Sequence, residues 1–193
     1  VKTYITANEG FIKRTIDFVS FMVSSFCFGL LVRQVNVVIG TSPQFFTVIS
    51  AWALAKLKRV PFVFELRDIW PASITAVGAM ERNWVITTLE KLEMFLYHQA
   101  DLVISVTHSF KSELQDRGVS GDKIKVVLNG VDLKKYKPLK NKDQRFAKKY
   151  KLQGKFVAGY IGTHGLAHAL DTIIEAAELL KEEDSIRIVF TGG

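Results

Sequence analysis

Apolar runs of two kinds alternate along the chain. Short β-branched or aromatic runs are typical of buried strands, and they cover residues 35–39, 61–66, 101–106, 123–130, 155–162 and 185–190. Between most of them lie segments with apolar residues at helical spacing, which end near Lys58, Ala100, Gly118 and Leu180. Near-continuous apolar strands between helices predict an α/β fold whose Rossmann-like parallel sheet is covered on both faces.

The sequence also predicts where some helices begin. Thr41, Ser42 and Pro43 follow the first strand, and we expect them to supply an N-cap and a proline in the first turn of the next helix. Leu170, Ile173, Ile174, Ala177 and Leu180 form the predicted core stripe of the last helix, which places Glu175 on its solvent side.

Residues 16–32 are apolar enough to suggest a membrane span. Asp17 interrupts one end, and the uncharged run that follows it has only 15 residues, diluted by serines and a glycine. Lys13, Arg14 and Arg33 flank the segment. We therefore expect a buried or membrane-touching helix rather than a span. A chain that starts with Val1 is also expected to be a fragment.

Positive charge is concentrated in one segment. The chain has a net charge of +7, but residues 134–151 hold nine lysines and arginines against one acid, Asp143, so the rest of the chain is close to neutral. Tyr136, Phe146 and Tyr150 interleave with these charges, which could indicate nucleic-acid binding. Pro138 and Asn141 favour a solvated linker instead. The predicted domains are residues 1–137 and 138–193, both incomplete.

Composition limits the chemistry that is open to the chain. Hydrophobic residues make up 48 % of it, which excludes a disordered protein. Cys27 is the one cysteine, so there is no intrachain disulfide. The sequence has no Cys/His cluster with metal-ligand spacing and no pair of aspartates two positions apart, so a metal–diphosphate site of the DxD type is absent.

In parallel α/β sheets, ligands bind at the carboxyl ends of the strands. That rule selects the residues that follow each apolar run: Thr41, Ser42, Arg67, Asp68, Thr107, Asn129, Gly130 and 162–165. The residues 162–165 are Gly-Thr-His-Gly, and His168 follows. Glycines before a helix N-terminus let backbone N–H groups approach a phosphate, so we interpret this turn as a phosphate cradle. The alternative is a tight turn whose histidines cap the helix.

Four motifs occur in order: PFVFELRDIWP, ADLVISVT, KIKVVLNGVD and GYIGTHGLAHALD. Together they resemble the retaining glycosyltransferases of the GT-B fold, group 1 or family 4, in the branch that builds bacterial surface polysaccharides such as capsule and O-antigen. The resemblance implies a fold of two Rossmann-like domains, here truncated at both ends. It also implies a nucleotide-sugar donor in the C-terminal domain, a lipid-linked saccharide acceptor in the N-terminal domain, and no metal or other cofactor. Members of the branch act at the inner face of the cytoplasmic membrane, so a peripheral membrane contact is expected.

The resemblance assigns roles to residues. Arg67 and Asp68 are the predicted catalytic pair, although an ion pair that fixes the following loop is an equal alternative. Trp70, Thr107 and Asn129 are expected on the acceptor side. The donor diphosphate is assigned to a set of five residues: Gly162, Thr163, His164, Gly165 and His168.

The family's E-x7-E motif is expected beyond Gly193. Glu175 and Glu183 have its spacing, but the solvent-facing position of Glu175 makes this a false match. We therefore expect the 193-residue chain alone to be inactive. A nucleotide-sugar epimerase of the same fold, and a non-catalytic nucleic-acid-binding module, are the two other functions that remain open. No nucleic-acid partner is expected if the transferase interpretation holds.

Overall fold

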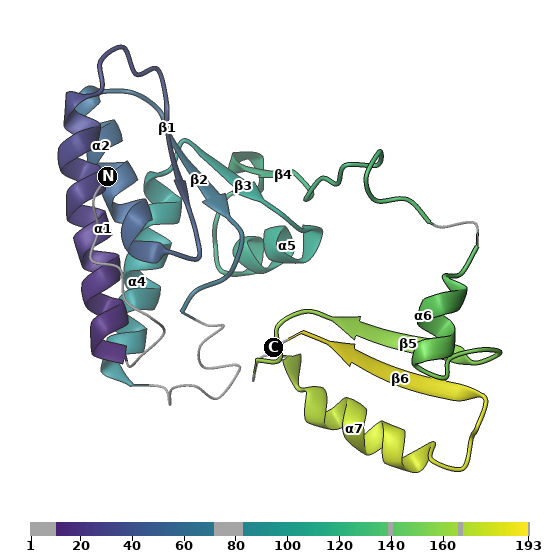
Figure 1. Cartoon of the computed structure of the whole chain (residues 1–193). Helices are drawn as coiled ribbons and strands as arrows, with labels where there is room; N and C mark the ends of the chain where they lie inside the picture. The colour runs from purple at the N-terminus through teal and green to yellow at the C-terminus, as the bar shows by residue number, and fades with distance from the viewer. Residues whose placement is uncertain (1–10, 72–82, 139–140, 166–167, 193) are drawn as a thin grey trace. The chain divides into compact units, whose positions relative to one another are not determined.

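The computed structural model describes residues 11–71, 83–138, 141–165 and 168–192 (Figure 1). The chain divides into two compact units, residues 1–130 and 131–193. The sequence placed the domain boundary slightly later, near Lys137.

Unit 1 is built on a parallel sheet with strands in the order β1-β2-β3-β4. The strands are β1 (Val38–Thr41), β2 (Phe62–Leu66), β3 (Leu102–Ser105) and β4 (Ile124–Val126). Register runs straight across the sheet, because Gly40 pairs with Phe64, Phe64 with Val103, and Val103 with Ile124. The predicted parallel sheet is thereby confirmed.

The helices of unit 1 are α1 (Phe11–Leu31), α2 (Phe45–Lys58), α4 (Trp84–Gln99) and α5 (His108–Asp116), followed by the short 3-10 helix η1 (Gly121–Lys123). Asn83 caps α4, since its side chain accepts hydrogen bonds from the N–H groups of Val85 and Ile86. The predicted cap of α2 is wrong. Helix α2 begins at Phe45, and Gln44 occupies the N-cap position without making a side-chain cap bond. Pro43 lies before the helix and not in its first turn.

The two faces of this sheet are buried unequally. Gly40, Phe64, Val103 and Ile124 share one face, and all four are buried. On the other face Val63 is buried, Ile104 is half-buried and Ile39 is 56 % exposed. Among the described residues, this second face is therefore covered less completely than the face of Phe64. The hydrophobic core lies between that face and helices α2, α4 and α5.

Glycine allows α2 to approach the sheet closely. A Cβ atom on Gly40 would lie 2.9 Å from the Cβ of Ala51 and 3.1 Å from the Cα of Val48. Contacts this short between backbone-anchored atoms cannot be relieved by rotating a side chain. Gly40 thus fixes the distance between β1 and α2.

A charged cluster joins α4 to the end of α5. The hydroxyl of Tyr97 donates to Glu93 at 2.7 Å, and the guanidinium of Arg117 donates to the second oxygen of Glu93 at 2.6 Å. Burial raises the pKa of Glu93, while the bonds from Tyr97 and Arg117 oppose this change. Burial and the neighbouring Glu93 also raise the pKa of Tyr97. A buried carboxylate needs such partners because leaving it unpaired would be costly.

Helix α1 covers residues 16–31 of the predicted segment and extends it toward the N-terminus. It packs along α2, with Gly29 next to Leu54. Its outer surface is apolar: Val23 and Phe28 are about half exposed and Leu31 is 74 % exposed. Phe26, on the same helix, is half-buried. Within the part of the chain that is described, none of the helices is both long and apolar enough to cross a bilayer.

Unit 2 contains the parallel pair β5 (Phe156–Ile161) and β6 (Ile186–Thr191), connected through α7 (Leu170–Leu179). It also contains α6 (Gln144–Lys149), so the interpretation of residues 134–151 as a simple linker is wrong over that stretch. The predicted core stripe of α7 is only partly realised, because Ile174 and Leu180 are exposed among the described residues. Glu175 is exposed, as predicted.

Candidate functional site

The turn after β5 is held by backbone and tyrosine hydrogen bonds. The N–H of Gly162 donates to the carbonyl of Thr191, which continues the pairing of β5 with β6. The hydroxyl of Tyr160 donates to the carbonyl of Thr163 at 2.8 Å. These two bonds fix residues 162 and 163 at the carboxyl end of the strand, where α/β folds place ligands.

Aromatic and imidazole rings gather around this turn. The ring centroid of Tyr160 lies 6.0 Å from that of His164 and 5.7 Å from that of His168. Phe190, on the neighbouring strand, meets His164 edge to face at 6.2 Å. The rings of Tyr160 and Phe190 therefore pack against the histidines of the turn. Both aromatic residues lie near the carboxyl ends of their strands.

A pocket of about 370 Å³ opens between the turn and the start of α7. The described residues that line it are His164, Gly165, Ala169, Leu170, Asp171, Ile174 and Phe190. His164 and Gly165 thus meet the helix N-terminus, as the cradle interpretation requires. Gly162, Thr163 and His168 do not appear among these lining residues.

The path into α7 differs from the expected one. The sequence predicted a helix directly after Gly165, but α7 begins at Leu170. Ala169 precedes it with a left-handed backbone (φ 46°) and makes no side-chain cap bond. The N–H of His168 donates to the carbonyl of Gly165, which closes a turn before the helix. The alternative in which the histidines cap α7 is therefore not supported, because no side-chain hydrogen bond caps this helix among the described residues.

The glycines at this site have different surroundings. A Cβ on Gly162 would lie 3.2 Å from the hydroxyl oxygen of Tyr160, whereas the nearest atom to a Cβ on Gly165 is a ring carbon of His168 at 3.8 Å. Gly192 has φ +149°, and a Cβ there would overlap the carbonyl oxygen of Gly162. Gly192 lets β6 end against the turn, a role that the sequence analysis missed although the glycine pair after β6 was visible.

Asp171 is a second residue that the sequence analysis missed. It lies in the first turn of α7 and lines the pocket. A carboxylate in that position accepts hydrogen bonds from hydroxyl groups and opposes a second negative charge nearby. The pocket consequently combines the positive end of a helix with one acidic side chain.

The strand ends of unit 1 form a separate cluster. The Oγ of Ser42, after β1, accepts hydrogen bonds from the N–H groups of Arg67 (3.0 Å) and Asp68 (3.3 Å), and it donates to the carbonyl of Asp68. Beside it, Thr41 donates to Glu65 at 2.6 Å. Ser42 is buried and Arg67 is exposed. Ser42 thus fixes the backbone of the loop that carries the predicted pair Arg67 and Asp68.

The three predicted acceptor-side residues have distinct surroundings. Trp70 stacks on Phe45 at 5.0 Å between ring centroids, so it anchors its loop to the start of α2. Thr107 caps α5 by accepting a hydrogen bond from the N–H of Phe110. Asn129 is exposed. Of the three, Trp70 and Thr107 have clear structural tasks.

The described residues contain no group of three or more histidine, cysteine, aspartate or glutamate side chains placed to hold a metal ion.

Comparisons with known proteins give the family. The chain is 25 % identical over 200 residues to an Escherichia coli (strain K12) protein named "Putative colanic acid biosynthesis glycosyl transferase WcaI", an alignment that covers 98 % of this chain and 49 % of that protein. Among solved structures it resembles Anabaena Alr3699/HepE in complex with UDP and glucose (TM-score 0.57, 13 % identity, 95 % of this chain and 54 % of that one). The complex of the same protein with UDP gives a TM-score of 0.61 at 13 % identity, over 92 % of this chain and 54 % of that one.

The chain therefore spans about half the length of these relatives. The structural likeness confirms the GT-B type of fold that the sequence predicted. The model of the family named Glycosyltransferase Family 4 matches residues 21–135, which is more than half of the sequence. The chain belongs to glycosyltransferase family 4.

Proposed function

We propose that the protein containing this chain transfers a sugar from a nucleotide-sugar to a lipid-linked saccharide acceptor in the synthesis of a surface polysaccharide. The observation that carries the proposal is the pocket between His164, Gly165 and the first turn of α7. It offers backbone N–H groups and the positive end of a helix dipole to a diphosphate at the carboxyl end of a parallel strand.

The donor side rests on unit 2. Breaking a glycosyl–phosphate bond leaves negative charge on the diphosphate, and preorganised donors near that charge lower the barrier. His164 lies at the pocket wall and could donate a hydrogen bond, and Asp171 could accept one from a sugar hydroxyl. The solved relative was crystallised with UDP, UDP-glucose and glucose, which supports a nucleotide-sugar as the donor class.

The acceptor side rests on unit 1. Arg67 and Asp68 follow β2 on a loop whose backbone is fixed by Ser42. In the proposed enzyme they orient the acceptor hydroxyl and stabilise charge at the reacting centre. Thr107 and Asn129 remain predicted acceptor-side residues, and Trp70 would act there by shaping the loop.

The reaction is proposed to retain the configuration at the anomeric carbon, and the site is proposed to lie at the inner face of the cytoplasmic membrane. The name of the E. coli relative refers to colanic acid biosynthesis, which supports a role in polysaccharide synthesis. The apolar outer surface of α1 supports a peripheral membrane contact. The family match favours a transferase over an epimerase or a nucleic-acid-binding module. The inactivity of the 193-residue chain alone stays a prediction.

The test is a transfer assay with the protein that contains this chain. Purified protein is incubated with a panel of nucleotide-sugars and a membrane extract that holds lipid-linked acceptors, and radiolabelled lipid product is measured. Nuclear magnetic resonance of the product then gives the anomeric configuration. Formation of labelled product supports the proposal. If the protein interconverts nucleotide-sugars without transferring them, it is an epimerase and the proposal is wrong.

A further inference from the structure

The pocket beside α7 is lined by two ionisable side chains, His164 and Asp171, and its described lining includes neither lysine nor arginine. The diphosphate of a nucleotide-sugar carries two negative charges, and a bound charge without a partner is costly. Histidine is the side chain whose charge ordinarily changes between about pH 5 and pH 8. His164 is therefore the side chain of this pocket wall that can supply a positive charge to a diphosphate.

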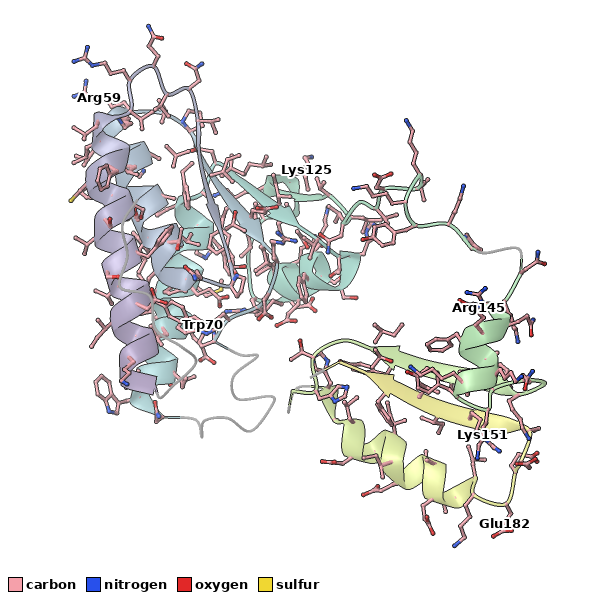
Figure 2. All side chains as sticks on the ribbon, viewed as in Figure 1. Arg59, Trp70, Lys125, Arg145, Lys151 and Glu182 are labelled. Atoms are coloured by element: carbon pink, nitrogen blue, oxygen red, sulfur yellow. The ribbon has the colours of Figure 1, made fainter. Side chains whose placement is uncertain are left out.

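Much of the positive charge of unit 2 lies at the other end of β5. Arg145 and Lys151 lie on α6 and just after it (Figure 2). Strand β5 begins soon after Lys151, at Phe156, and the turn with the pocket follows its end. The six residues of β5 span about 20 Å, which exceeds the distance over which exposed charges attract each other strongly in salt solution. The cations of α6 therefore do not neutralise a diphosphate in the pocket.

The imidazole of His164 is held by its neighbours while its nitrogens stay accessible. The ring packs against Tyr160 of β5 and Phe190 of β6, and the residue is exposed. A Cβ on Gly192 would lie 3.4 Å from Nε2 of His164, so the glycine keeps a side chain away from that nitrogen. A protonated imidazole donates hydrogen bonds from both nitrogens. The ring is thus placed to donate to a ligand in the pocket.

The groups around His164 balance one another before a ligand binds. Strand β5 contributes Tyr160, β6 contributes Phe190, the turn contributes His168, and α7 contributes Asp171. The carboxylate of Asp171 attracts a positive charge on the imidazole, whereas a protonated His168 and the positive end of α7 repel one. The two negative charges of a bound diphosphate shift this balance toward the protonated imidazole.

We propose that His164 takes up a proton when the donor diphosphate binds, so that the affinity for the nucleotide-sugar falls as the pH rises from about 6 to about 8. The proton passes from the buffer to an imidazole nitrogen, and no bond of the donor changes. A ligand that binds the protonated state better is bound more tightly at low pH, which fixes the sign. The inference rests on the proposed function for the identity of the ligand.

The experiment is calorimetric titration of UDP-glucose into the protein that contains this chain. UDP-glucose is the probe because its diphosphate stays ionised, whereas the terminal phosphate of UDP itself titrates near about pH 6. Titrations at about pH 6 and about pH 8 give the two affinities. Titrations at one pH, in two buffers with different enthalpies of ionisation, give the number of protons taken up on binding.

Three variants identify the group that takes up the proton. His164→Gln cannot titrate, and His164→Lys carries a positive charge throughout this pH range. His168→Gln is the matched control, because His168 also packs against Tyr160 but does not line the pocket.

We expect the unsubstituted protein and His168→Gln to bind UDP-glucose on the order of tenfold more tightly at the lower pH, with proton uptake. His164→Gln should bind weakly at both pH values and take up no proton. His164→Lys should bind tightly at both pH values, also without uptake, because it restores the charge.

Proton uptake that persists in His164→Gln, or that disappears in His168→Gln instead, would overturn the inference and leave the donor pocket in place. So would an affinity of the unsubstituted protein that does not change with pH. Absence of UDP-glucose binding at both pH values would overturn the proposed function, and this inference with it.

Discussion

Ser42 and Arg67 are joined by a hydrogen bond of 3.0 Å from the backbone N–H of Arg67 to the buried Oγ of Ser42. The same oxygen accepts the N–H of Asp68 and donates to its carbonyl. One hydroxyl after β1 thus satisfies three polar groups of the loop after β2. Because the pair of predicted catalytic residues lies on that loop, the Ser42 hydroxyl can set their position through the backbone.

Ser42→Ala should lower the free energy of unfolding by about 1–3 kcal/mol, because it leaves two part-buried backbone N–H groups without their acceptor. Urea denaturation followed by circular dichroism measures the change. Ser20→Ala is the matched control, since that hydroxyl donates to a carbonyl within its own helix. A loss no greater than in the control would mean that water replaces the Ser42 hydroxyl.

The buried cluster of Glu93 gives a pH prediction. Burial raises the pKa of Glu93 in the folded state above its ordinary value of 4.5. The folded state then binds more protons than the unfolded state above pH 4.5, so stability should fall as the pH rises through this window. Glu93→Gln cannot titrate, so the stability of the unsubstituted chain relative to this variant should decline from about pH 4.5 upward. Urea titrations at several pH values measure it. The opposite slope would mean that Arg117 outweighs burial.

The sequence predicted the elements more reliably than their ends and surfaces. Strands near 61–66 and 101–106 were predictable because short apolar runs bounded by polar residues are typical of buried strands. The start of α2 was mispredicted because Ser42, a residue type that favours N-caps, instead binds the neighbouring loop. Such long-range hydrogen bonds join residues 25 positions apart. Local patterns carry no information about them.

The candidate sites, like the fold, could be predicted only in part from local sequence patterns. The position of His164 and Gly165 at a strand end followed from the glycines and the parallel-sheet rule. Helix α7 begins at Leu170, four residues later than a helix directly after Gly165 would, and Asp171 lines the pocket while His168 does not. Ala169, the residue before the helix, has a left-handed backbone. Alanine rarely adopts that conformation, so no local sequence pattern indicated it.

Asp68→Asn tests the acceptor side in the protein that contains this chain. If Asp68 acts in the transition state, turnover should fall by at least tenfold while the affinity for the nucleotide-sugar stays the same. Steady-state kinetics and calorimetric titration of the donor give the two quantities. Asp116→Asn, at an exposed position near the end of α5, is the control. Parallel losses of melting temperature and activity would assign Asp68 a structural role.

The outer face of α1 can be tested independently of charge. Val23→Asn/Leu31→Asn replaces two exposed aliphatic side chains and should weaken binding to vesicles at high salt, where headgroup attraction is screened. Because both side chains are already exposed, stability should change by less than about 0.5 kcal/mol per site. Leu57→Asn on α2 is the control, since Leu57 is also exposed but on another helix. Unchanged vesicle binding together with a clear loss of stability would show that this face packs against protein.

The pocket beside α7 gives the sharpest test of the donor site. Gly165 lines the pocket, and a Cβ there meets no atom closer than 3.8 Å, so Gly165→Val should fill space that a diphosphate needs without disturbing the fold. Gly162→Val would instead press on the hydroxyl of Tyr160 and act through the turn. Gly159→Val is the control, because a Cβ at that position of β5 has no neighbour within 4 Å.

Calorimetric titrations with UDP and with uridine, in the protein that contains this chain, separate the diphosphate from the nucleoside. Gly165→Val should abolish the advantage of UDP over uridine, and His164→Ala should reduce it by the 1–3 kcal/mol typical of a hydrogen bond to a charged group, about ten- to a hundredfold in affinity. His168→Ala should change it less, because His168 contacts the ring of Tyr160 rather than the pocket wall. If His168→Ala causes the larger loss, the backbone around residue 168 must rearrange on binding. If Gly165→Val binds UDP as well as the Gly159→Val control, the residues 162–165 form a turn and no phosphate cradle, because a side chain at the proposed contact point would then be harmless.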